Sequence, residues 1–515
     1  MTIGTFDIRS AAAGALADAA PLRAADRVVA RRIWILATVL YVALAAGTAM
    51  TRLPYGDEGE LASPAYNLVH RGHLEVTQWE QARQTHKAYW MPPVFFFAQA
   101  AVQMIAGFGI IQFRLGTVLW GLVLLYTSGA IVRRLTNDAM LAALIAFALA
   151  TDYTFLMHAG IGRCEIMSAA LAIAASAAYL ARRERSLTQA MLASHTLMTL
   201  SGLTHPVGGI MWMPCLIGLQ LGFDWRRLRV KHYALAALPY VAGMLGWGAY
   251  IVQDVPEFRR QFFGISLSEH RFAGFAAPIT AIQRELGRFL QYYGIRPNAS
   301  WAMRLKAMLA VGYVIGLAGA LAIPQVRKQA FVKGALLLLA AQMFILTFLE
   351  GTKQSHYIVD VIPTLVAILV TMLWTLFNGS DTPARRMAIA AIAFALFVVQ
   401  VGPVAFRIRE NPYRSDFLPA VAVARPYVER GAYVIGGPEF AMPFNFPENV
   451  VSRPDYGYGA ARKPALVLTS VGQLQRNTAL TRNDPDFYRY MTVTFYQRYR
   501  LIYQRGDVAV YRSIL

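Results

Sequence analysis

The sequence has few cysteines and few charged residues. Cys164 and Cys215 are the two cysteines among 515 residues, and neither stands at a paired-cysteine or Cys/His spacing typical of a metal site. A disulfide framework and a zinc site of that kind are therefore not indicated. Charged residues make up 15% of the chain and hydrophobic residues 56%, which is more apolar than an ordinary soluble domain. This balance predicts an integral membrane protein.

Acidic residues are especially scarce. The chain has 29 Asp and Glu against 49 Lys and Arg, and its formal net charge is +20. Such a charge can indicate nucleic-acid binding, but here the basic residues form short clusters between apolar runs. Retention of Lys and Arg on the cytoplasmic side of membrane spans explains that pattern. We therefore expect membrane lipids, and no nucleic acid, among the partners.

Long apolar runs recur along the chain at lengths near the 20 or so residues that cross a bilayer. They predict about eleven transmembrane helices, at about 33–50, 114–132, 139–157, 164–181, 188–203, 207–222, 233–252, 303–323, 331–349, 357–377 and 387–406. A further run, 91–111, opens with Pro92-Pro93 and is expected to lie on the outer face without crossing. If it crossed, Arg133-Arg134 and later basic clusters would fall outside the cell.

Three segments follow from this topology. Residues 1–32 are expected to form a cytoplasmic N-terminal segment, and 33–406 the transmembrane domain, with outer loops at 51–113 and 253–302. The tail, 407–515, has no long apolar run. Its short β-type runs, at 432–435, 465–468 and 508–511, lie between Gly, Pro and Asn turns. The predicted fold is an α-helical polytopic membrane protein with a small soluble α/β domain at the C-terminus, on the extracytoplasmic side.

Acidic residues stand at the outer ends of two predicted spans. Asp57 and Glu58 follow the first span, within Gly56-Asp57-Glu58-Gly59-Glu60. Carboxylates beside a bilayer lose hydration, so a pair kept there indicates proton abstraction, metal ligation or recognition of a cation. Glu60 is better interpreted as a solvated acid. Glu165 opens the span at 164–181, two residues after Arg163; the two could orient a substrate or form a local ion pair.

Basic and aromatic residues share the predicted outer face. Lys87 lies next to His86 ahead of the outer helix, and Lys353 with His356 precedes the span at 357–377. Positive charge at such positions stabilises a phosphate leaving group, although lysines at a membrane surface also extend toward lipid headgroups. His205, in Thr204-His205-Pro206, is either a ligand contact or a structural hydrogen-bonding residue. Four residues are assigned to substrate binding: His86, Tyr89, His205 and Tyr357.

In their order along the chain, these motifs resemble the GT-C glycosyltransferases. The similarity rests on Gly-Asp-Glu-Gly at 56–59, Asn-Leu-Val-His-Arg-Gly at 67–72, the Pro-Pro-opened helix, Phe113-Arg114-Leu115, Arg-x-Glu at 163–165, His205-Pro206 and Lys-Gln-x-His-Tyr at 353–357. The chain looks most like the branch containing protein mannosyltransferases that use dolichyl-phosphate-mannose and bacterial lipid A aminoarabinose transferases. The resemblance covers about 33–405.

The resemblance implies an inverting transfer of sugar from a polyprenyl-phosphate donor to a lipid, glycan or protein acceptor at the outer leaflet. It implies that Asp57 is the catalytic base, with Glu58 beside it and Glu165 as a second outer acid, where relatives often have aspartate. The implied donor-phosphate contacts are Lys87, Lys353, His356 and Arg163. Some relatives use a divalent metal, so a metal at Asp57 and Glu165 stays open as the possible cofactor. The implied location is a bacterial inner membrane, with the active site facing the periplasm.

Two other functions remain open. A transporter or flippase of lipid-linked sugars also needs many spans, but it predicts ionisable residues near the middle of the membrane and broken helices in matching halves. A non-catalytic envelope assembly protein predicts that Asp57→Asn leaves function intact. The chain lacks a Gly-rich nucleotide loop, which disfavours a soluble nucleotide-sugar donor.

Overall fold

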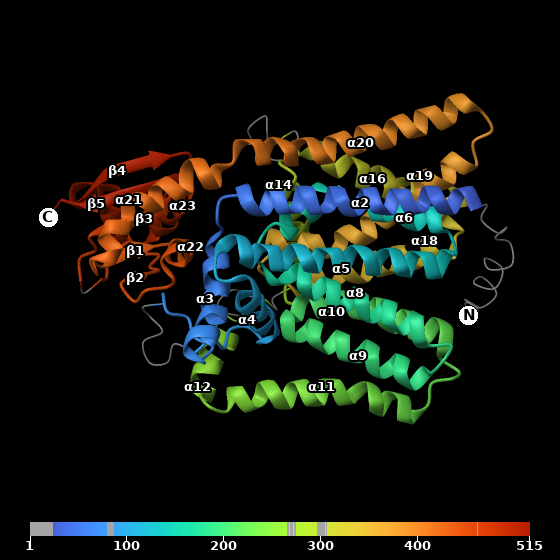
Figure 1. Ribbon diagram of the computed structural model, residues 1–515, viewed down its shortest axis with the longest axis horizontal. Helices are drawn as coiled ribbons and strands as arrows, with labels where there is room; N and C mark the ends of the chain where they lie inside the picture. The colour runs from blue at the N-terminus through green and yellow to red at the C-terminus, as the bar shows by residue number, and fades with distance from the viewer. Residues whose placement is uncertain are drawn as a thin grey trace.

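The computed structural model describes residues 24–79, 87–264, 267, 271, 274–295, 304, 306–460 and 462–514. Long helices run side by side as a bundle, and a small domain built on a sheet lies at one end of it (Figure 1). The prediction of a polytopic α-helical membrane protein with a small C-terminal α/β domain is confirmed.

Eight described helices are long and apolar enough to cross a membrane. They are α2 (Ala24–Thr51), α5 (Ile110–Thr136), α8 (Cys164–Arg182), α10 (Pro206–Asp224), α11 (Val230–Ile251), α18 (Ala330–Phe348), η3 with α19 (Ser355–Val361 and Ile362–Asn378) and α20 (Pro383–Glu410). A ninth span is the pair α6 (Ala139–Ala150) and α7 (Tyr153–Ala159), bent by 63°.

The remaining two of the eleven predicted spans are helices as well. One is α9 (Leu187–Thr204), whose polar side chains include His195, and the other is α16 (Ala307–Ala322), which has 16 residues. Each predicted apolar run therefore corresponds to helix, although two of these helices are less apolar or shorter than a typical span.

The segment predicted to lie on the outer face contains α4 (Val94–Ala106), capped by Pro93. Its 13 residues extend about 20 Å at 1.5 Å per residue, which is too short for a hydrocarbon core of about 30 Å. Four other described helical pieces join the long helices outside the spans: α12 (Val255–Phe258), η2 (Arg259–Gly264), α14 (Pro278–Tyr292) and α17 (Pro324–Arg327).

Helix α3 (Gly56–Arg71) connects the bundle to the C-terminal domain. It begins five residues after α2 ends, which puts Asp57 and Glu58 in its first turn, and it ends at Gly72, whose φ of 77° suits glycine. The glycine stop expected at 72 is thus present. At Gly59, an added Cβ would lie 2.1 Å from the carbonyl oxygen of Pro438, so only glycine lets this helix dock on the C-terminal domain.

The C-terminal domain follows α20. Its helical part comprises η4 (Tyr413–Phe417), α21 (Leu418–Glu429), α22 (Pro438–Ala441), η5 (Met442–Phe444), α23 (Val471–Leu480), η6 (Thr481–Asn483), α24 (Pro485–Arg489), η7 (Tyr490–Thr494) and α25 (Phe495–Arg498). Its sheet consists of β1 (Val434–Gly436), β2 (Val450–Val451), β3 (Leu466–Ser470), β4 (Tyr499–Arg505) and β5 (Val508–Ser513).

The strand order is β2-β1-β3-β5-β4, with β1 parallel to β2 and β3, and β5 antiparallel to β3 and β4. The three β-type runs predicted from sequence correspond to β1, β3 and β5, and helix α22 brings this sheet against α3.

Candidate functional site

Arg163 lies between two acids that are far apart in the sequence. One terminal nitrogen, Nη1, contacts Asp57 Oδ2, while Nη2 and Nε bind the carboxylate of Glu165, with both Nε distances at 3.1 Å. The Glu165 side chain is 2% exposed and that of Asp57 is 41% exposed. The structure thus brings three of the predicted site residues together, and of the two acids Asp57 is the one open to solvent.

This arrangement includes the local ion pair between Arg163 and Glu165, which was one of the two alternatives for these residues. It also extends it, because the same guanidinium reaches Asp57, 106 positions earlier in the chain. One guanidinium therefore pairs with two carboxylates, one on each side.

Glu58 faces away from this cluster and is completely buried. Arg114 donates from Nε to Oε1 at 2.7 Å and from Nη2 to Oε2 at 2.6 Å, and the backbone N–H groups of Gly162 and Tyr55 each donate at 2.8 Å. Burial alone would raise the pKa of Glu58, but the charge and hydrogen bonds of Arg114 bring that pKa below its usual value. Because both of its carboxylate oxygens accept hydrogen bonds, Glu58 stabilises the turn that precedes Asp57.

Arg114 completes that support. Its guanidinium also donates to the carbonyl oxygens of Ala49 and Arg52 at 2.9 Å and of Leu53 at 3.1 Å. A buried ion pair therefore fixes the path from the end of α2 into α3, and this path carries Asp57. Arg114 belongs to the Phe113-Arg114-Leu115 motif, but its pairing with Glu58, 56 positions earlier, has no local signal in the sequence.

An aromatic group adjoins the acid cluster. Tyr55 Oη lies 3.2 Å from His356 Nε2, and the Arg163 guanidinium lies 5.9 Å from the centre of the Tyr55 ring. The His158 ring is 5.9 Å from that of His356. His356, predicted to contact the donor, therefore lies beside the Asp57 cluster; Tyr55 and His158 were missed by sequence reasoning.

His205 and Tyr357, both predicted to bind substrate, contact each other. Tyr357 Oη is 3.5 Å from His205 Nε2, and His205 Nδ1 is buried without a hydrogen-bond partner among the described residues. Burial lowers the pKa of His205 to about 4; the charges of Arg163 and Arg271 act in the same direction and that of Glu165 opposes them. The imidazole is therefore neutral near pH 7. Arg271 is a further cation that the sequence analysis did not select.

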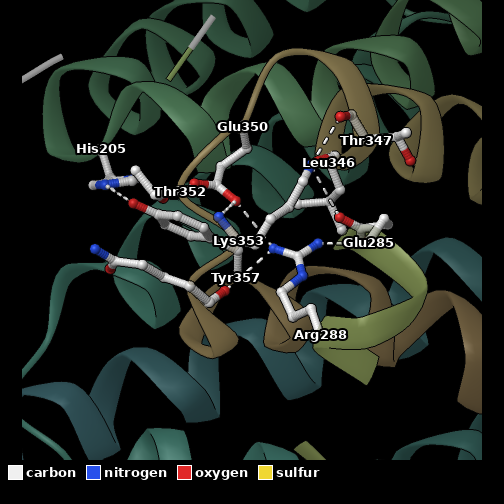
Figure 2. Close-up of polar contacts among 10 residues, drawn as sticks. His205, Glu285, Arg288, Leu346, Thr347, Glu350, Thr352, Lys353 and Tyr357 are labelled. Carbon is white, nitrogen blue, oxygen red and sulfur yellow. Dashed lines mark hydrogen bonds and ion pairs between the residues drawn. The ribbon is translucent and has the colours of Figure 1, made fainter. Parts of the chain in front are cut away.

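Lys353 belongs to a closed network of charges at the end of α18. Its ammonium donates to the carbonyl oxygens of Leu346 and Thr347 and pairs with Glu285 at 3.2 Å. Arg288 pairs with Glu285 and, at 3.1 Å, with Glu350. Figure 2 shows Lys353 and Arg288 converging on Glu285, while Tyr357 is directed toward His205 on the other side.

A lysine that binds phosphate is expected to have a free ammonium, whereas the ammonium of Lys353 is paired with protein groups. Burial lowers its pKa, against the attraction of Glu285. Glu285, Arg288 and Glu350 were missed by sequence reasoning. The i,i+3 spacing of Glu285 and Arg288 was a usable signal for their own pairing, but not for their link to a loop more than 60 residues later.

Lys87 and Tyr89 lie away from the Arg163 cluster. Lys87 Nζ donates to Gln253 Oε1 at 2.9 Å, and the Tyr89 ring stands 4.8 Å from that of Tyr250. No recorded contact within the described ranges joins either residue to Arg163. His86 lies outside the described residues.

The acids do not fit a metal site as they stand. Asp57 and Glu165 share the guanidinium of Arg163, so a positive charge already occupies the space between them. In the part of the chain that the structure describes, no group of three or more His, Cys, Asp or Glu side chains could hold a metal ion.

Comparison with solved structures identifies the fold. The chain is similar to ArnT from Cupriavidus metallidurans bound to undecaprenyl phosphate, with 17% identity and a TM-score of 0.57 over 95% of this chain and 98% of that one. It is also similar to the oligosaccharyltransferase AglB from Archaeoglobus fulgidus in complex with an inhibitory peptide and a dolichol-phosphate. For AglB the identity is 13% and the TM-score 0.54, over 94% of this chain and 74% of that one.

Sequence comparison matches no family model and no curated protein. At such low identities the structural likeness establishes the fold. The fold shared with ArnT extends over nearly the whole chain, including the C-terminal part that the sequence resemblance covered only loosely.

Proposed function

We propose that this integral membrane protein is an inverting glycosyltransferase that moves a sugar from a polyprenyl-phosphate donor to an acceptor at the outer face of a bacterial inner membrane. The observation that carries the proposal is Asp57. It is a partly exposed carboxylate, held by Arg163 at the start of α3, in a fold shared with an oligosaccharyltransferase.

In the proposed reaction Asp57 accepts the proton of the acceptor hydroxyl. The acceptor oxygen then forms a bond to the anomeric carbon while the bond from that carbon to the donor phosphate breaks, and the phosphate leaves with the electron pair. General-base catalysis of this kind contributes roughly 10²–10⁴-fold to a rate. Arg163 orients Asp57, and Glu165 holds Arg163 from the other side.

The donor class is supported by two relatives in fold, because ArnT was solved with undecaprenyl phosphate and AglB with dolichol-phosphate. A polyprenyl chain lies in the bilayer, so its phosphate arrives at the membrane surface. Among the basic residues assigned to that phosphate, Lys87 keeps N–H donors beyond the one that Gln253 accepts. We assign phosphate binding to Lys87 and a positioning role to Lys353, whose donors are directed into its own network.

The test is transfer in reconstituted vesicles supplied with polyprenyl-phosphate-linked sugars and candidate acceptors. Asp57→Asn should lower transfer by roughly 10²–10⁴-fold at unchanged thermal stability. Glu448→Gln, an exposed acid of the C-terminal domain, is the matched control and should behave as wild type. If a folded Asp57→Asn variant transferred sugar at the wild-type rate, Asp57 would not be the catalytic base. If the wild-type protein moved the donor across the membrane without any sugar transfer, it would be a flippase.

The orientation has a separate test in intact cells with an impermeant thiol reagent. In a background lacking Cys164 and Cys215, a cysteine in place of Gln354 should be labelled from outside and one in place of Arg226 should not. The reverse labelling pattern would place the acid cluster on the cytoplasmic side and contradict the proposed outer-face reaction.

A further inference from the structure

A cavity lies between the bundle and the C-terminal domain. Its volume is about 310 Å³, at the lower end of the range for ligand sites. Its walls come from the end of α2 and the turn that follows (between 48 and 56), from the end of α20 (407–412), and from the loops around Ser470 and Asp507. Asp57, Arg163 and Glu165 are not among its lining residues, so it is separate from the acid cluster.

Three arginines from distant segments line this cavity: Arg52, Arg407 and Arg476. Arg52 is half-buried and uses Nη1 to donate to the carbonyl oxygen of Met157 at 2.8 Å. Arg407 and Arg476 are exposed, and within the described ranges neither forms an ion pair with an acid. Burial lowers the pKa of Arg52 to about 10, and the charges of Arg114 and Arg407 add to the effect against that of Glu58. Positive charges are therefore gathered here without acids paired to them.

The acids on the same walls do not neutralise these arginines by direct contact. Asp507 accepts hydrogen bonds from Ser470 Oγ and from the N–H of Gly472 at 2.8 Å, and Glu410 is exposed. Glu439 is 6% exposed, and its Oε2 has no hydrogen-bond partner among the described residues. Burial raises the pKa of Glu439 to about 7, helped by Glu60 and Glu58, so much of its population is uncharged near neutrality.

Part of the remaining lining is apolar, and it lies where two long helices end. Met157 and Ile408 contribute from the bundle, and Phe417 and Phe440 from the C-terminal domain. An occupant with an anionic head and an apolar body matches both kinds of wall, because arginine binds phosphate oxygens while the apolar side chains lose contact with water.

We propose that this cavity binds the phosphate headgroup of an anionic membrane lipid, with Arg52, Arg407 and Arg476 as its contacts and Glu439 as a partner for a headgroup hydroxyl. The site is distinct from the donor site and does not depend on the proposed transfer reaction. A lipid bound here contacts both the C-terminal domain and the bundle and holds them together. Tyr55 and Gly56, which directly precede Asp57, also line the cavity.

The experiment uses the full chain in an uncharged detergent with four probes: a short-chain phosphatidic acid, a diacylglycerol with the same chains, inorganic phosphate and a polyprenyl phosphate. We expect wild type to bind phosphatidic acid roughly tenfold or more tightly than diacylglycerol, with a matching rise in Tm. R407Q/R476Q should lose that preference. R425Q/R430Q removes two exposed arginines of the same domain that do not line the cavity, and it should keep the preference.

Three results would overturn the proposal. One is unchanged phosphatidic acid binding by R407Q/R476Q at normal stability. Another is binding of inorganic phosphate as tight as that of the lipid, which would identify a site for the free anion. The third is an equal loss of polyprenyl phosphate binding in R407Q/R476Q, which would make the cavity part of the donor site. Loss of transfer in Asp57→Asn is independent of all three, so failure of this proposal and failure of the proposed function are distinguishable.

Discussion

Two clusters of charged side chains in this protein contain the same kinds of residue but differ in their exposure to solvent. In the first, Arg163 joins Glu165 to Asp57, and Asp57 remains 41% exposed. In the second, Arg288 and Lys353 meet Glu285 and Glu350, and the side chains of all four are no more than 10% exposed. In the first group the carboxylate of Asp57 is accessible to solvent. In the second group the charged side chains are buried and paired with one another. Access to solvent, more than the type of charge, separates a candidate for chemistry from a structural network.

The largest expected effect is a loss of stability when an arginine is removed from the buried cluster of Glu285, Arg288, Glu350 and Lys353. Arg288→Gln should leave Glu285 and Glu350 buried with less positive charge and lower the free energy of unfolding by about 3–5 kcal/mol. Denaturation followed in detergent would measure this. Arg284→Gln, on the exposed side of the same helix, should change stability little. An Arg288→Gln variant as stable as wild type would mean that the network contributes nothing to the fold.

A smaller effect is expected from the open group. Arg163→Lys keeps the positive charge, but one ammonium cannot reproduce the forked contacts to both acids. Transfer should fall roughly 10–100-fold, mainly in kcat, while stability stays near that of wild type, because positioning of Asp57 is worth a few kcal/mol at most. Arg183→Lys is the control, since Arg183 binds Asp224 in a comparable way outside both groups. Equal rates for Arg163→Lys and wild type would contradict the role given to Arg163.

The smallest effect concerns the contact between α3 and the C-terminal domain. The pKa of Glu439 is raised to about 7 by burial, so the folded protein holds a proton that the unfolded chain loses above about pH 4.5. Its contribution to stability is therefore present below that pH and is lost as the pH rises to about 7. Glu439→Gln should flatten the fall in Tm across this window, because each unit by which the pKa is raised corresponds to about 1.4 kcal/mol of stability. An unchanged pH profile would show that Glu439 does not titrate there.

Much of the fold could be predicted because apolar runs and turn residues are local signals. Each run near 20 residues corresponds to helix, Gly72 ends α3 as expected, and three β-type runs are strands. The site was predicted in part. Asp57, Arg163 and Glu165 were selected and lie together, and His205, His356 and Tyr357 lie near them or contact one another.

The contacts of other site residues have no signal in their sequence neighbours. Lys353 looked like a phosphate contact because the surrounding motif is basic and aromatic, yet its acid partner, Glu285, is on another helix. Glu58 was grouped with the catalytic acids because it adjoins Asp57. Adjacent residues in the first turn of a helix point in different directions, and Glu58 points inward to Arg114.

The sequence by itself determined that this chain is a membrane protein with many helices, that its C-terminal part is of a different kind, and which acids lie at the ends of its spans. These properties depend on hydrophobicity and on residues close in the chain. Only the tertiary structure decided that Arg163 joins Asp57 to Glu165 and that Lys353 is paired with Glu285. It also decided that a cavity lined by three arginines lies between the bundle and the C-terminal domain. Those features depend on pairs of residues up to several hundred positions apart, and their energies are set by burial, which exists only once the helices have packed.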